Sequence, residues 1–79
     1  MKIKETPVQL FEIGNYYAVG AGGDYYVVKV VALDLLNGHI IGISQYIKKR
    51  QRLDKQAFEQ EATRCMFNFF NGLIFYEVK

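Results

Sequence analysis

The sequence has no tryptophan, and its 79 residues include one cysteine, one proline and one histidine. A single cysteine, Cys65, excludes an internal disulfide, which is consistent with a reducing compartment. No hydrophobic run approaches the ~18–20 residues of a membrane span, and no apolar segment typical of a signal peptide follows Met1. We therefore expect a single domain over residues 1–79, located in the cytoplasm and without contact to a membrane.

The sequence also lacks the residue patterns typical of metal sites, of acid–base catalysis and of phosphate-binding loops. Metal sites need several His, Cys or carboxylate ligands at defined spacing, whereas His39 and Cys65 are isolated and fit an exposed turn and a core position. The acidic residues are scattered, with no pair spaced for general acid–base work. The glycine-rich segment 20–23 precedes a β-prone run instead of the helix that a phosphate loop requires. The sequence thus predicts no enzyme, no catalytic residue, no metal, no cofactor and no small-molecule substrate.

Hydrophobic residues make up 51% of the chain and aromatic residues 15%. Three β-prone runs separated by glycine-containing turns, at residues 16–19, 25–33 and 39–47, predict antiparallel strands. Asp54 is a candidate N-cap, and an apolar stripe at helical spacing predicts a helix from Lys55 to about Asn71. The stripe consists of Phe58, Ala62, Cys65, Met66, Phe69 and Phe70. Residues 73–78 then form a last strand.

These elements predict an α+β fold with two layers, in which one helix packs on one face of an antiparallel sheet. The predicted order is β-β-β-α-β. Pro7 restricts residues 8–13 to a short edge strand at most, so the sequence leaves open whether residues 1–13 pair in the sheet or exchange into another copy.

The loop between the second and third strands decides which side chains share a face. A loop over residues 35–38 puts Asp34 opposite His39, and a two-residue Asn37-Gly38 turn is the alternative. The longer loop separates an apolar face from an outer face that carries Tyr25, Lys29 and Tyr46. Because side chains alternate with period two, burial favours this register. The apolar face consists of Tyr26, Val28, Val30, Ala32, Ile41, Ile43 and Ile47.

A basic connector follows the third strand and supplies Lys48, Lys49, Arg50 and Arg52. With the outer sheet face and Phe67 on the back of the helix, it forms the candidate interaction surface. A solvated loop is the alternative for the connector, and the N-terminal segment 2–13 could cover part of the outer face. The candidate surface consists of Tyr25, Lys29, Tyr46, Lys48, Lys49, Arg50, Arg52 and Phe67.

Two functions fit this surface. The first is a small non-catalytic protein-interaction module of the inhibitor or adaptor type, from a phage or mobile element, that binds a protein or its own copy through exposed aromatic residues. The second is a nucleic-acid-binding module that uses residues 48–55 and the outer sheet face. The net charge is only +2, which favours the first function.

Overall fold

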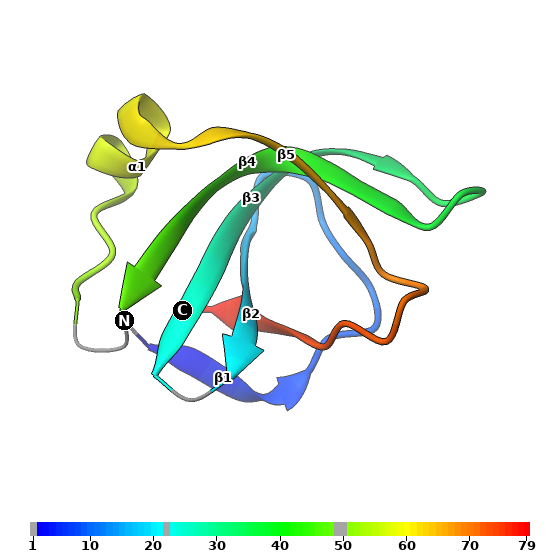
Figure 1. Ribbon diagram of the computed structural model, residues 1–79, viewed down its shortest axis with the longest axis horizontal. Coiled ribbons are helices and arrows are strands. Elements are labelled where there is room, and N and C mark those ends of the chain that lie inside the picture. The colour runs from blue at the N-terminus through cyan, green and yellow to red at the C-terminus, as the bar shows by residue number, and fades with distance from the viewer. Residues whose placement is uncertain (1, 22, 49–50) are drawn as a thin grey trace.

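The computed structural model describes residues 2–21, 23–48 and 51–79 as six strands and one short helix (Figure 1). In chain order the elements are β1 (Ile3–Pro7), β2 (Tyr16–Ala21), β3 (Asp24–Asp34), β4 (His39–Lys48), α1 (Lys55–Glu61), β5 (Thr63–Asn68) and β6 (Phe75–Val78). The three strands predicted over residues 16–47 are confirmed as β2, β3 and β4. In the described ranges no helix is long and apolar enough to cross a membrane.

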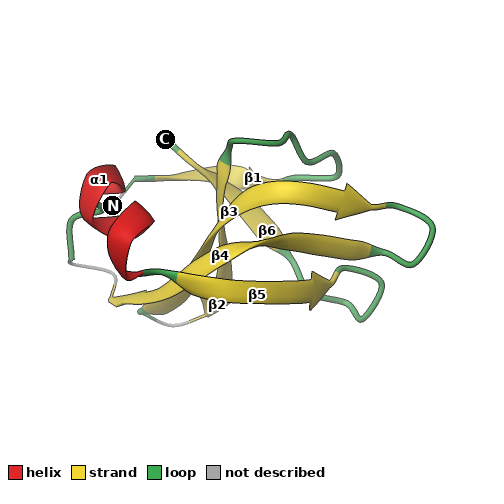
Figure 2. Cartoon of the chain, turned by 90° about the horizontal axis from the view of Figure 1, so that it is seen from above, coloured by secondary structure: helices red, strands yellow, loops and turns green. Residues whose placement is uncertain are grey.

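All six strands form one antiparallel sheet in the order β1-β6-β2-β3-β4-β5, so β1 and β5 are its edges. The sheet is strongly curved, and the β3–β4 loop lies at the end away from α1 (Figures 1 and 2). The small antiparallel sheet with one helix agrees with the predicted class. The predicted order β-β-β-α-β is wrong, because β5 is an additional strand and the N-terminal strand spans Ile3–Pro7 in place of residues 8–13.

Helix α1 has seven residues and ends well before Asn71, so the predicted helix length is wrong. Its start is as predicted: Asp54 Oδ1 accepts hydrogen bonds from the backbone N–H groups of Gln56 and Ala57, at 3.0 and 3.3 Å. Ala62 already has an extended backbone, with ψ 147°. The strand that follows pairs with β4, which satisfies backbone groups that a longer helix would leave unpaired at that edge.

The β3–β4 hairpin has the predicted loop, and Asp34 lies opposite His39. The register then shifts by one residue between Val30 and Ala32, so that Val31 has no partner on β4. Such a bulge inserts one extra residue into one strand. Every pair between the bulge and the start of β3 is therefore displaced by one position from the prediction.

Gly42 of β4 lies beside this bulge. A Cβ at this position would lie 2.1 Å from the carbonyl oxygen of Lys29, so only glycine fits. Beyond the bulge, Tyr46 lies opposite Tyr26, whereas the regular register had placed it on one face with Tyr25. The predicted assignment of faces is wrong here, because a slip of one residue moves every side chain to the other side of the sheet.

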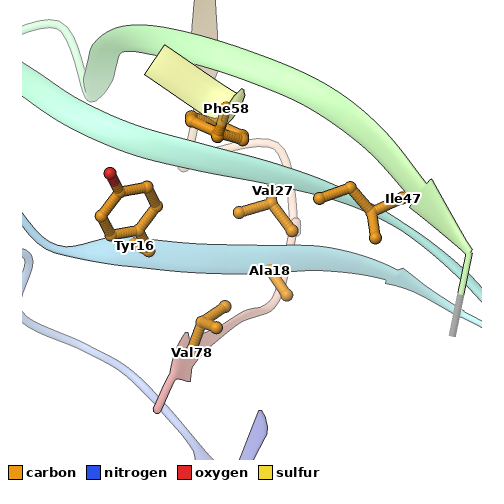
Figure 3. Close-up of a cluster of buried hydrophobic side chains, with 6 residues drawn as sticks. All are labelled: Tyr16, Ala18, Val27, Ile47, Phe58 and Val78. Atoms are coloured by element: carbon orange, nitrogen blue, oxygen red, sulfur yellow. The ribbon is translucent and has the colours of Figure 1, made fainter. Parts of the chain in front are cut away.

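Helix α1 contacts one face of the sheet through Phe58, which is 1% exposed and lies among the side chains drawn in Figure 3. The rings of Phe58 and Tyr16 meet edge to face with their centroids 5.3 Å apart. The face of β3 under the helix is the one predicted to be the outer face. The buried side chains of this first cluster are Tyr16, Ala18, Val27, Ile47, Phe58 and Val78.

Connecting segments cover part of the opposite face. Phe11, from the β1–β2 connection, meets the rings of Tyr17 and Phe75 edge to face, at centroid distances of 5.0 and 5.2 Å. The backbone N–H of Glu12 donates to the Tyr17 hydroxyl at 2.8 Å. The N-terminal segment thus folds onto the sheet, on the face opposite α1. The buried side chains of this second cluster are Tyr17, Val19, Val28, Val30, Ile40 and Phe75.

Candidate interaction surfaces

The predicted aromatic surface is divided between different parts of the molecule. Tyr25 is half-buried against the first cluster, whereas Tyr46 lies on the opposite face of the sheet. Phe67, expected on the back of a helix, lies on β5, and its ring packs on Phe75 at a centroid distance of 5.9 Å. These three aromatic residues therefore do not form one continuous surface.

Lys29 joins the sheet to α1. Its Nζ forms an ion pair with Glu59, which also accepts a hydrogen bond from the Tyr16 hydroxyl at 3.1 Å. The hydrogen bond from Lys29, followed by that from Tyr16, lowers the pKa of Glu59. The same bond raises the pKa of Lys29, while burial and then the bond to Glu59 raise the pKa of Tyr16. This network holds the helix on the sheet, so we assign Lys29 a structural role.

An exposed aromatic pair lies near the start of β3 and the end of β4. Tyr26 and Tyr46 are directly opposite each other and are 50% and 48% exposed, with ring centroids 5.3 Å apart. The Tyr46 hydroxyl donates to Asp24, and this hydrogen bond raises the pKa of Tyr46. Lys48 is exposed opposite Asp24. The pair is a small amphipathic patch that the predicted register had not brought together.

Exposed aliphatic side chains gather on β3, β4 and β5 at the end of the sheet away from α1. Ile41 and Met66 lie opposite each other and are 39% and 61% exposed, and Val31 at the bulge is 54% exposed. Leu35 and Leu36 in the adjacent loop are 68% and 90% exposed. We call Val31, Ile41, Met66 and the unpaired edge of β5 the apolar edge surface. Sequence reasoning missed it because Met66 was assigned to a core stripe.

The basic connector contributes to a pocket on the side of the molecule where the two chain ends lie. Lys48 and Arg52 are exposed, whereas Lys49 and Arg50 lie outside the described residues. The pocket has a volume of about 350 Å³ and is lined by Lys2, Arg52, Leu53, Lys55, Val78 and Lys79. We call it the basic pocket. Sequence reasoning missed Lys2 and Lys79, because only the pairing of β1 with β6 brings them to the connector.

The residues considered for catalysis or metal binding stay apart. His39 and Cys65 lie on neighbouring strands, but their positions in the ladder put them on opposite faces. His39 Nδ1 is 4.0 Å from Asp34 Oδ2, and Cys65 packs half-buried against the second cluster. Within residues 2–21, 23–48 and 51–79, no group of three His, Cys, Asp or Glu side chains could hold a metal ion.

The structure thus offers three candidate interaction surfaces: the aromatic Tyr26–Tyr46 pair, the apolar edge surface and the basic pocket. No protein-family model, curated protein or solved structure matches this chain.

Proposed function

We propose that the chain is a small non-catalytic protein-interaction module that pairs with a second copy of itself through the apolar edge surface. The observation that carries the proposal is an open edge strand, β5, whose Met66 is 61% exposed beside Ile41. Natural edge strands are usually protected by lysine, proline or a bulge. The β5 sequence has neither lysine nor proline, and Arg64 is its only charged residue. Such an edge favours the addition of another strand.

The hydrogen bonds of β5 indicate which backbone groups a partner would meet. The N–H of Phe69 donates to the carbonyl oxygen of Gly38 at 2.8 Å, toward the β4 side. Alternate residues of an antiparallel strand turn their N–H and C=O groups to opposite sides. The backbone groups of Arg64, Met66 and Asn68 therefore point away from β4, toward the position of an added strand, and the carbonyl oxygen of Asn68 also accepts a hydrogen bond from the N–H of Asn71 at 3.5 Å.

One register of self-pairing fits these residues best. If Met66 lies opposite its own copy on a two-fold axis, Arg64 lies opposite Asn68 of the second chain. This register forms about six backbone hydrogen bonds between the chains, two for each hydrogen-bonded pair. It also joins Ile41 and Met66 of both copies into one apolar row. A register centred on Arg64 would place like charges opposite each other, which is destabilising.

The first test is the oligomeric state, measured by size-exclusion chromatography with light scattering over a range of protein concentrations. We expect a dimer that Met66→Lys converts to a monomer, because two lysines would meet on the two-fold axis. The matched control Gln56→Lys adds the same charge on the exposed side of α1 and should stay dimeric. A wild-type protein that stays monomeric at all concentrations, or a dimer that survives Met66→Lys, would contradict the proposal.

Cross-linking tests the register independently. In a Cys65→Ser background, Met66→Cys should form an intermolecular disulfide on mild oxidation, because hydrogen-bonded partners have Cα atoms about 5.5 Å apart, within the disulfide range. Gln56→Cys in the same background should remain unlinked. A dimer in which both variants cross-link equally would refute pairing through β5.

A further inference from the structure

The basic pocket is distant in the fold from the apolar edge surface and has a different chemistry. Four of its lining residues are cationic and none is acidic: the cations are Lys2, Arg52, Lys55 and Lys79. Its apolar part is well anchored, because Val78 is 7% exposed and Leu53 packs against the first cluster. The N–H of Lys79 donates to the carbonyl oxygen of Lys2 at 2.9 Å, which fixes the two chain ends beside each other.

No acidic side chain in the part of the chain that the structure describes forms an ion pair with the cations of the basic pocket. Lys4 and Lys29, outside the pocket, are neutralised by Glu77 and Glu59. No such ion pair joins any pocket cation to a described acidic side chain, and the Nζ of Lys55 lies 4.9 Å from the centroid of the Tyr16 ring. Asp54 is next to Lys55 in the sequence, but its carboxylate accepts hydrogen bonds from the backbone N–H groups of Gln56 and Ala57.

This arrangement has a consequence for ligand binding. Uncompensated like charges raise the local electrostatic potential, and a concave site lined by one sign of charge attracts ligands of the opposite sign. The net charge of the chain is only +2, so four cations in one pocket are a strong local concentration. An anion bound there would relieve the repulsion among them.

We propose that the basic pocket binds phosphate groups, and that a polynucleotide backbone supplies them. Lysine binds phosphate as a point charge and arginine as a bidentate donor, and the pocket has both. The volume of about 350 Å³ is at the small end of ligand sites, which range from roughly 300 to 1,000 Å³, and suits one nucleotide unit. Lys48, at the start of the connector, is also exposed. Four or more cations suit a chain of phosphates better than a single carboxylate.

The experiment uses fluorescence anisotropy of a labelled 20-nucleotide DNA strand over a series of salt concentrations. If four cations each neutralise one phosphate, the slope of log K against log salt is about −2.8, at ~0.7 for each contact with a single strand. The double variant Arg52→Ala/Lys55→Ala should halve this slope and lower the affinity roughly tenfold or more at low salt. The control Lys4→Ala removes a cation outside both the pocket and β5 and should change the slope little.

A parallel titration with ATP, followed by NMR, identifies the source of the phosphate. Binding of the DNA strand with the expected slope, together with weaker binding of ATP, supports a polynucleotide ligand. Binding of ATP that is at least as tight, and that Arg52→Ala/Lys55→Ala abolishes, supports the phosphate site but rejects a polynucleotide. The proposal is overturned if neither ligand binds, or if the pocket variant and the control behave alike. No residue of β5 lines the basic pocket. The result for phosphate binding is therefore independent of whether the chain dimerises through β5, and the titrations can also be run on the Met66→Lys variant.

Discussion

Replacing Gly42 by alanine tests the register on which the positions of the surfaces depend. The new Cβ would lie 2.1 Å from the carbonyl oxygen of Lys29, about 0.9 Å inside the 3.0 Å limit that real Cβ atoms respect. The methyl group of Val28 lies only 3.1 Å away, so the alanine cannot avoid the clash by a small tilt. Strands β3 and β4 would have to separate at the bulge.

The cost follows from three contributions. Overpacking that shifts backbone costs about 1–3 kcal/mol, and one or two weakened ladder hydrogen bonds add about 0.5–1.5 kcal/mol each. Alanine in a strand is better than glycine by roughly 0.5–1 kcal/mol, which offsets part of this. We expect a net loss of about 2–3 kcal/mol in the free energy of unfolding, which for a domain of this size lowers Tm by roughly 10–20 °C.

Urea and thermal denaturation followed by circular dichroism measure this loss. Ser44→Ala is the matched control, because it lies two residues further along the same face of β4 and should change stability by no more than about 0.5 kcal/mol. If Gly42→Ala were as stable as the wild type, the Lys29 carbonyl could not occupy that space. The bulge, and with it the pairing of Tyr46 with Tyr26, would then be refuted.

Three further predictions concern the sheet and the helix. Val31 has no partner on β4, so deleting it preserves every observed pair and face of the hairpin, and the protein should fold with a loss of no more than about 1 kcal/mol in stability. Deleting Val27 instead shifts the paired residues of β3 to the other face and should unfold the protein. Circular dichroism measures both results. Glu59→Gln should lower Tm most at neutral pH and least in acid. The folded-state pKa of Glu59 is lowered, so its contribution to stability is present above the unfolded value of 4.5 and is lost as pH falls through the folded value. Asp54→Ala should cost about 1 kcal/mol in urea denaturation, because two N–H groups of α1 lose their acceptor, and an unchanged stability would argue against this cap.

Local signals in the sequence were sufficient for the strands and the loop of the central hairpin, although not for its register beyond the bulge, and for the start of the helix. The β-prone runs of residues 25–33 and 39–47 and the turn signal between them predicted β3 and β4, and the separation of apolar from polar side chains favoured the longer loop that pairs Asp34 with His39. Asp54 was recognised as the N-cap because its residue type and position before an apolar stripe are typical of helix starts. These features depend on contacts between residues close in the chain.

The segment after Ala62 could not be assigned from local pattern alone. Its apolar residues fit a helical stripe, but Cys65, Phe67 and Phe69 also alternate with Arg64 and other outward residues, which suits a strand. The decision depends on the free edge of β4, which is a tertiary feature. Because the strand turns Met66 outward, the same misassignment hid the apolar edge surface.

The candidate surface was predicted in part. Lys48 and Arg52 are exposed as expected, but the bulge moved Tyr46 away from Tyr25. A glycine inside a strand is a known sign of a bulge, so Gly42 was a signal that the register reasoning did not use. Lys2, at the far end of the chain, could be placed beside the connector only with the sheet topology in hand.

The two buried clusters have a consequence for how the molecule unfolds. Neighbouring residues of one strand enter different clusters, as Tyr16 and Tyr17 do on β2 and Val27 and Val28 do on β3. Both clusters pack on the same strands, so loss of either cluster would remove the strand surface on which the other cluster packs. We expect the amide protons of β2 and β3 to exchange with solvent only through complete unfolding, and those of β1 and β5, which lie at the edges, to exchange through local opening.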